Sequence, residues 1–181
     1  MSKARNRKKV LRAKVIQVPK RIFYKVFNQN KEIKKIILKE NRNNLSEDEW
    51  IRVVSCFIVN KNGEVLMETR GDNGIDAGML DLCSGHIDCF ETPTQTMLRE
   101  LYEELCIKRE EAFRKLMKIT TKQLIFDDAQ KKRNYFDTFF YLPVEEEDFK
   151  IQEDEISCIK WVPMEEVFEL IENGQTRFPK R

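Results

Sequence analysis

Several short runs are rich in apolar and β-branched residues and lie between polar segments, the longest at residues 51–59, and this pattern predicts β-strands. Two gaps between these runs carry turn residues, Asn28-Gln29-Asn30-Lys31 and Asn62-Gly63. Asn-Gly between apolar runs is a strong short signal for a hairpin, so we expect two hairpins in the first half of the chain. Residues 41–44 are expected to be a polar connector. The expected strands of this half are 22–27, 33–38, 51–59, 64–69 and 79–83.

One segment in the middle of the chain changes to the 3.6-residue period of a helix. Thr92 is a suitable N-cap, Pro93 suits the first helical position, and Gln95 completes a capping box. One face of this helix is apolar and is expected to be buried; it carries Met97, Leu98, Leu101 and Leu105. Another face carries three carboxylates at spacing i, i+3 and i+4, namely Glu100, Glu103 and Glu104.

This acidic face has two interpretations. Like charges at such spacing cost an isolated helix about 0.2–0.5 kcal/mol each, so the cluster is either a solvated surface or a binding site for a cation. Mg²⁺ prefers oxygen ligands and is often held by carboxylates together with substrate phosphates. The three glutamates alone favour the solvated surface, and the residues that precede the helix are needed to decide between the two.

The second half of the chain continues with both kinds of element. Residues 110–117 either extend the central helix or start another one, and a final amphipathic helix is expected from Pro163 to about Asn173-Gly174. Strands before and after a central helix, with a further helix at the end, predict an α/β fold with a mixed sheet. The expected strands of this half are 120–126, 135–142 and 159–162.

Residues 85–107 resemble the Nudix box, whose pattern is G-x5-E-x7-R-E-U-x-E-E-x-G-U with U aliphatic. Eight of the nine fixed positions match, and these are Gly85, Glu91, Arg99, Glu100, Leu101, Glu103, Glu104 and Ile107. Cys106 stands where the family has glycine, the left-handed residue that ends the helix. A cysteine there should cost about 1 kcal/mol or change the cap, but it removes no ligand.

The resemblance implies an α/β/α sandwich with a mixed sheet and the Nudix loop–helix. It also implies hydrolysis of a nucleoside diphosphate linked to another moiety, by attack of water on phosphorus with the help of Mg²⁺ or Mn²⁺. In the family, Glu91 and Arg99 pair and hold the loop against the helix. Clustered carboxylates titrate as a group, so the sequence does not name the general base. The implied metal ligands of the box are Glu100, Glu103, Glu104 and the carbonyl of Gly85.

Two candidate residues lie outside the box. Glu155 is six residues before Trp161, where some family members have a glutamate that binds metal or activates water; the alternative is one more acid in the run Glu153-Asp154-Glu155. Arg70 closes a strand before a variable loop, and it either contacts a substrate phosphate or is an exposed strand end. We take Glu155 as a candidate metal ligand and Arg70 as a candidate substrate-binding residue.

Weaker motifs at 59–66 and 155–166 resemble the Nudix subgroup related to isopentenyl-diphosphate isomerase. These isomerases use a cysteine just before a Gly-His pair and a metal-binding histidine after the glycine. Here Ser84 stands where the isomerases have the cysteine, and this departure together with the complete Arg-Glu-x-x-Glu-Glu set favours hydrolysis. His86 matches the position of the isomerase histidine, and it is either a metal ligand or an ordinary loop residue, as in the hydrolases. The alternatives that stay open are an isomerase-like enzyme and a non-catalytic module that binds nucleotides or RNA.

Charge and cysteine content add the remaining expectations. Residues 1–25 hold ten Lys or Arg and no acid, and the remainder carries 23 basic against 31 acidic residues. We therefore expect a basic, partly disordered arm at 1–20, which either contacts RNA or is solvated, before a single domain at 21–181. No run is long enough to span a membrane, and five cysteines without a C-x-x-C pair indicate reduced thiols. We expect a cytoplasmic protein, and the resemblance is compatible with a homodimer.

Overall fold

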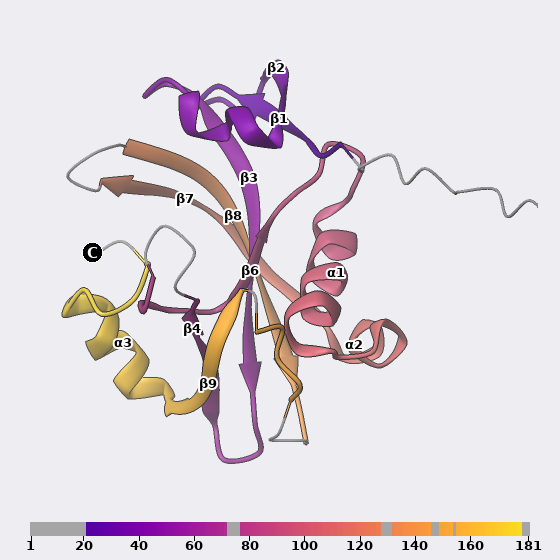
Figure 1. Cartoon of the computed structure of the whole chain (residues 1–181), viewed down its shortest axis with the longest axis vertical. Helices are drawn as coiled ribbons and strands as arrows, with labels where there is room; N and C mark the ends of the chain where they lie inside the picture. Colours follow the sequence, from indigo (N-terminus) through magenta and orange to yellow (C-terminus); the bar gives the residue numbers. More distant parts are fainter. Residues whose placement is uncertain (1–20, 72–76, 128–131, 146–148, 154, 179–181) are drawn as a thin grey trace, which may run out of the picture.

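The structure is a computed structural model, and it describes residues 21–71, 77–127, 132–145, 149–153 and 155–178 (Figure 1). The predicted basic arm at 1–20 lies outside these residues. The strands are β1 (Phe23–Phe27), β2 (Ile33–Leu38), β3 (Trp50–Val59), β4 (Glu64–Arg70), β5 (Leu80–Asp81), β6 (Cys83–His86), β7 (Met117–Asp127), β8 (Lys132–Pro143) and β9 (Ile156–Pro163). The helices are η1 (Lys39–Asn44), α1 (Pro93–Leu105), α2 (Arg109–Lys115) and α3 (Met164–Glu172).

Strand β3 is the centre of the sheet because both of its edges are paired. On one side β8 runs parallel to it along its whole length, from the pair Trp50↔Asn134 to the pair Val59↔Pro143. On the other side three antiparallel strands follow one another: β1 pairs at Trp50, β6 at Val53–Cys56, and β4 at Val59. The sheet is therefore mixed, as the sequence predicts.

The predicted hairpin of β3 and β4 opens after a single residue pair, Val59↔Val65. β6 then occupies the edge of β3, and β4 pairs with β9 instead. The single strand predicted at 79–83 is wrong for this reason: β5 pairs with β4, while β6 pairs with β3 and extends to His86. The diverging strands thus place Gly85 and His86 in the sheet, just before the loop that leads to α1.

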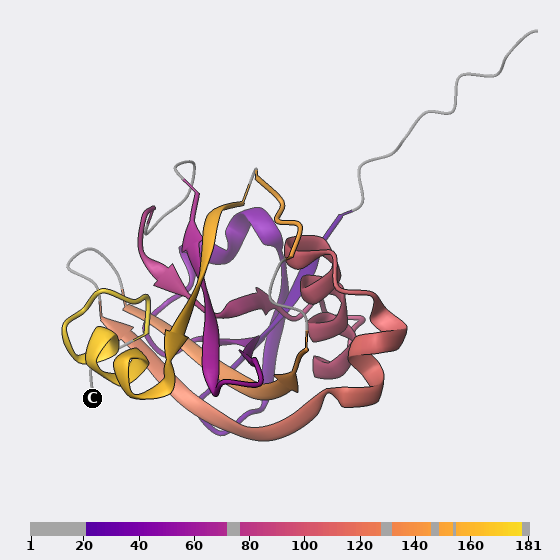
Figure 2. The same ribbon diagram turned by 90° about the horizontal axis from the view of Figure 1, so that it is seen from below.

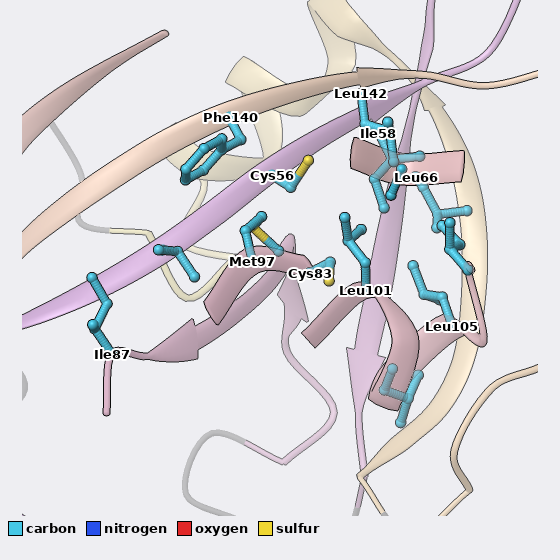
Figure 3. Packing of buried hydrophobic residues seen from close by; sticks show 14 residues of the cluster. Cys56, Ile58, Leu66, Cys83, Ile87, Met97, Leu101, Leu105, Phe140 and Leu142 are labelled. Atoms are coloured by element: carbon cyan, nitrogen blue, oxygen red, sulfur yellow. The ribbon is translucent and has the colours of Figure 1, made fainter. Parts of the chain in front are cut away.

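The helices cover the sheet in two layers, with α1 and α2 on one face and α3 on the other (Figures 1 and 2). Residues on alternate positions of β3 and β4 face the two layers in turn. The apolar stripe of α1 packs on one face of the sheet (Figure 3); it comprises Met97, Leu101 and Leu105, which lie against Cys56, Ile58, Phe140 and Leu142. Val167 and Leu170 of α3 pack on the other face with Val65, Met67 and Val162. Burial of each such side chain contributes about 1.5–3 kcal/mol to the free energy of unfolding. The helices on both faces of the mixed sheet confirm the α/β/α sandwich expected from the sequence.

Two shorter segments complete the comparison with the sequence. Residues 110–117 do not extend α1, because the separate helix α2 covers Arg109–Lys115. The connector expected at 41–44 belongs to the 3₁₀ helix η1, which directly follows β2. Among the described residues, none of the helices has the length and apolar character that a membrane crossing requires.

Helix α1 begins and ends as the sequence suggests. The Thr92 hydroxyl accepts a hydrogen bond from the backbone N–H of Gln95, and the Gln95 side chain accepts one from the backbone N–H of Thr92, so the capping box is complete. Cys106 takes the left-handed conformation, with φ 55° and ψ 20°, and its N–H donates to the carbonyls of Leu101 and Tyr102. The cysteine therefore keeps the cap geometry that glycine adopts without strain.

We expect Cys106→Gly to leave the thermal stability unchanged or to raise it by up to about 1 kcal/mol, because glycine has no Cβ to oppose a positive φ. Such a change corresponds to a rise of about 2–4 °C in Tm for a domain of this size, measured by differential scanning calorimetry. Cys106→Ala is the matched control: it also removes the exposed thiol but keeps the Cβ, so it should not be stabilised. A clear fall in Tm for the glycine variant would contradict this account of the cap.

Candidate active site

A cavity of about 490 Å³ lies between the loop–helix segment, the sheet and η1. Every site residue predicted from the sequence lines it: Arg70, Gly85, Glu91, Arg99, Glu100, Glu103, Glu104 and Glu155. Residues that sequence reasoning did not select line it as well, and those with charged side chains include Lys39, Arg42, Glu68, Asp81, Asp137 and Arg177. The cavity thus brings an acidic set and a basic set of side chains to one place.

Gly85 lies directly against Glu100 of α1. A Cβ atom built on Gly85 would come within 1.9 Å of Glu100 Oε1 and 2.2 Å of its Cδ, so no side chain fits at this position while Glu100 stays in place. The Glu100 side chain is buried, and burial raises its pKa to about 7, with Arg99 opposing this effect and Glu103 adding to it. The close approach sets one carboxylate of the acidic face against the backbone of β6.

Arg99 connects the loop to the helix. Its Nε lies 3.1 Å from Glu91 Oε1, and its Nη1 lies 2.8 Å from Glu100 Oε1 and 2.9 Å from Glu103 Oε2. Glu91 also accepts a hydrogen bond of 2.8 Å from the hydroxyl of Thr96. The ion pair between Glu91 and Arg99 that the resemblance implies is present, and it fixes the guanidinium between two carboxylates of the acidic face.

Glu104 faces inward, where it meets a carboxylate that the sequence did not single out. Glu68 of β4, Glu104 of α1 and Cys83 of β6 each offer one ligand atom, and these atoms all lie within 4.8 Å of one another. Both glutamates are buried, at 4% and 8% exposed, and burial raises the pKa of each well above its ordinary value. The mutual repulsion of the two glutamates further raises the pKa of Glu104.

The donor set suits a divalent cation. Glu68 Oε1 and Glu104 Oε2 are buried and have no hydrogen-bond partner among the described residues. A buried polar group without a partner costs about 1–3 kcal/mol, and more when it is charged, unless a cation or a proton compensates it. Carboxylates from two elements, next to Glu100 and the exposed Glu103, therefore provide the hard oxygen ligands that Mg²⁺ or Mn²⁺ binds.

The two candidates outside the box occupy different parts of the cavity wall. Glu155 is exposed, and its negative charge contributes to the raised pKa of Glu100 and of Glu68, which places it near the acidic set. Arg70 Nη1 lies 3.4 Å from Asp81 Oδ2, and Arg177 Nη1 lies 3.1 Å from the same oxygen. Asp81 therefore holds two arginines at the cavity.

His86 is enclosed by aromatic rings. Its imidazole stacks on Tyr24 with ring centroids 5.2 Å apart, and it meets the edge of Tyr135 at 5.8 Å. Burial, followed by the nearby cations Arg42 and Arg177, lowers the pKa of His86 well below its ordinary value, so the ring is neutral. His86 is absent from the group of metal-capable side chains found among the described residues, unlike the histidine that the isomerase relatives use.

Asp137 of β8 is a further buried carboxyl that the sequence did not indicate, since it lies in an aromatic strand. It accepts a hydrogen bond of 2.7 Å from the hydroxyl of Ser55, and within the described residues its Oδ1 has no hydrogen-bond partner. Burial raises the pKa of Asp137 from its ordinary 3.8 to about 7, against the effect of Ser55. The sequence signal for such a residue is a single acidic side chain within a strand rich in aromatic residues.

We expect Asp137→Asn to raise the stability of the protein at pH 8 and to change it little at pH 4. Because the folded protein has the higher pKa, stability falls as the pH rises from about 4 through 7, by up to about 4 kcal/mol, and asparagine removes this loss. Melting temperatures measured from pH 4 to pH 8 test this, with the exposed Glu110→Gln as control. A stability difference that does not vary with pH would contradict the assignment of this pKa.

The chain is 30% identical over 128 residues to "Nudix hydrolase 3" of Arabidopsis thaliana, a match that covers 66% of this chain and 16% of that protein. The structure of DR0079 from Deinococcus radiodurans is similar with a TM-score of 0.68 and 20% identity, covering 88% of this chain and 93% of that one. The NUDIX domain of Shewanella oneidensis NrtR, solved with ADP ribose, is similar with a TM-score of 0.51 and 23% identity, covering 65% and 75% of the two chains.

The fold and the cavity together define the class of protein: an α/β/α sandwich in which a loop and helix present clustered carboxylates beside a mixed sheet. The family model for the NUDIX domain matches residues 49–180. The chain belongs to the NUDIX family, whose members generally use divalent metal ions.

Proposed function

We propose that the protein hydrolyses a nucleoside diphosphate linked to another moiety and that it does so with Mg²⁺ or Mn²⁺. One observation carries this proposal: buried carboxylates from two elements converge on one side of the cavity, and two of their oxygens have no partner among the described residues. A divalent cation would compensate these carboxylates when they are ionised, and a diphosphate that binds beside them would share the same cation.

The protein side chains position the reactants. Glu100, Glu103 and Glu104, together with Glu68 and the Gly85 carbonyl, would hold the metal, and Glu155 would add a charge from the facing loop. When bound, a divalent ion polarises phosphate oxygens and lowers the pKa of bound water. Arg99 keeps Glu100 and Glu103 at fixed distances through its own pair with Glu91. This arrangement fits phosphoryl transfer, which depends more on positioning and charge stabilisation than on covalent help.

Arg70 is the proposed contact to a substrate phosphate. It lies at the end of β4 on the cavity wall, and Asp81 orients its guanidinium. Arg70 thus lines the same cavity as the glutamates. A substrate that carries a diphosphate would then contact the metal on one side and an arginine on the other. The presence of ADP ribose in the Shewanella relative supports a nucleoside diphosphate derivative as the class of substrate.

Isomerisation is less well supported by the same residues. Ser84 stands where isomerase relatives use a cysteine, and its hydroxyl lies 3.4 Å from Asp81 Oδ2. The enclosed, neutral His86 is held by tyrosine rings. These contacts support isomerisation less than the clustered carboxylates support hydrolysis.

A phosphate-release screen tests the proposal. The full-length protein would be assayed with nucleoside diphosphate derivatives, nucleoside triphosphates and 5′-triphosphate RNA, each with Mg²⁺, with Mn²⁺ and with a chelator. Metal-dependent turnover of one class, lost in Glu104→Gln and kept in the exposed Glu110→Gln, is the expected result. Silence across the panel from folded protein that binds Mg²⁺ would overturn the proposal, and isopentenyl diphosphate would then be tested by NMR.

A further inference from the structure

Two cations on the cavity wall differ from the others in their surroundings. Arg99 pairs with the box glutamates, and Arg70 and Arg177 both contact Asp81. Lys39 and Arg42 of η1 also line the cavity, but among the described residues neither has a carboxylate oxygen within 4.0 Å. Two positive side chains therefore face the cavity without a counter-charge from the described part of the protein.

The geometry of η1 holds these two side chains together. Residues three apart in a 3₁₀ helix lie on the same side of the helix, so Lys39 and Arg42 point from one face. Arg42 also lies near Tyr24, where its charge opposes the rise that burial causes in the pKa of this tyrosine. Tyr24 is 4% exposed and stacks on His86. Arg42 therefore lies on the part of the cavity wall that also holds Tyr24 and His86, the residue that follows Gly85.

The pair lies on a different wall of the cavity from the acidic set. The glutamates come from β4 and α1, whereas Lys39 and Arg42 come from the short helix that follows β2, seen beside β1 in Figure 1. The NUDIX family match begins at residue 49, so η1 is not part of the segment that defines the family. The anionic part of a ligand would bring the two cations a counter-charge, just as a metal would bring one to the glutamates.

We propose that Lys39 and Arg42 form a second anion site, which binds a phosphoryl group of the substrate in addition to the diphosphate held at the acidic set. This inference rests on the proposed function and narrows its substrate. The moiety linked to the nucleoside diphosphate then begins with a phosphoryl group, so substrates with three or more phosphoryl groups in a row are preferred.

Binding of inorganic pyrophosphate and of tripolyphosphate tests the site without any assumption about the nucleobase of the substrate. Isothermal titration of the full-length protein with each anion, in Mg²⁺ and at low temperature, gives two dissociation constants, and ³¹P NMR checks that both anions stay intact. We expect tripolyphosphate to bind at least about tenfold more tightly, because its third phosphoryl group adds charge-assisted contacts with Lys39 and Arg42. The double variant Lys39→Gln/Arg42→Gln should lose this preference while its affinity for pyrophosphate changes less than about threefold.

Two further variants make the comparison specific. Lys118→Gln/Lys122→Gln removes two exposed lysines of β7 that do not line the cavity, and it should keep the preference. Arg42→Lys keeps the positive charge, so this variant should keep most of the preference for tripolyphosphate. Equal binding of the two anions by the unaltered protein, or an unchanged preference in the glutamine double variant, would overturn the inference. A protein that hydrolyses a diphosphate derivative without this preference refutes the anion site alone, and one with the preference but no turnover refutes the proposed function alone.

Discussion

Replacing Glu104 with glutamine should lower kcat by about a thousandfold and, in metal-free protein, should raise the melting temperature. Removal of one charged group that stabilises a transition state costs about 10²–10³ in rate, and loss of a metal ligand also weakens metal binding. The increase in stability has a separate cause. Glu104 is buried beside Glu68 and has an oxygen without a partner among the described residues, so its charge opposes folding until a cation is bound.

The size of the change in stability follows from the free energy that a buried carboxylate oxygen without a partner costs the folded state. An unsatisfied buried polar atom costs about 1–3 kcal/mol, and each kcal/mol corresponds to about 2–4 °C in Tm for a domain of this size. Glutamine keeps the shape of Glu104, removes the charge, and places an amide donor next to the Glu68 carboxylate. Added Mg²⁺ should then raise the Tm of the unaltered protein, because it binds only the folded state, and should raise that of the variant much less.

Two matched variants separate the metal from the packing. Glu103 has a side chain that is 47% exposed and paired with Arg99, so Glu103→Gln should reduce turnover without the gain in stability. Glu110 is exposed on α2 and does not line the cavity, so Glu110→Gln should change neither quantity. Unchanged turnover in Glu104→Gln would refute the metal site, and a lower Tm without metal would show that the Glu104 charge is compensated within the protein.

The loop–helix segment was predictable from sequence because its signals are local. Thr92, Pro93 and Gln95 specify the start of α1 within one turn, and the apolar stripe specifies the buried face. The Nudix box fixes the order of the charged residues, and the ion pair between Glu91 and Arg99 follows from that order once the loop folds back on the helix. Even the departure at Cys106 is a local matter, since the backbone takes the left-handed conformation regardless of the side chain.

Glu68 and Asp137 could not be found in the same way. In sequence each occupies an ordinary position in a strand, and a strand position does not reveal what lies opposite to it. Glu68 approaches Glu104 because β4 leaves β3 after one residue pair and β6 enters between them. Asp137 meets Ser55 because β8 pairs in parallel with β3, a long-range arrangement with no local signal.

The cationic residues of η1 show a third situation. Arg42 lies in the stretch 41–44 that the sequence identified only as a connector, and Lys39 lies just before it. Both carry charges that resemble those of many exposed residues. They acquire a role only when the β1–β2 hairpin pairs with the end of β3 and carries η1 to the cavity. Sequence reasoning thus selected the box glutamates and Arg70. The places of Glu68, Lys39 and Arg42, by contrast, depend on how the strands pair and how the first hairpin docks.

Replacing Gly85 with alanine should lower kcat by about a hundredfold or more while leaving the fold intact. The added Cβ would meet Glu100 Oε1 at 1.9 Å, so the carboxylate must move. The atoms that clash are at the end of a side chain and not in the backbone, and therefore the helix and the sheet need not separate. A displacement of about 1 Å at a positioned group is enough to cost about 10² in rate.

Gly63 is the control for this substitution, because its backbone conformation requires glycine but the space around it does not, whereas Gly85 shows the reverse. It has φ 80° in the turn between β3 and β4 and nothing within 4 Å of its missing Cβ, whereas Gly85 is not among the residues with positive φ. Gly63→Ala should therefore cost about 1 kcal/mol of stability and leave turnover unchanged. Gly85→Ala should lose turnover and Mg²⁺ affinity with a smaller change in Tm. If both variants lose stability alone, Gly85 serves only the packing of the loop, and the carboxylate of Glu100 does not need its place against β6 for catalysis.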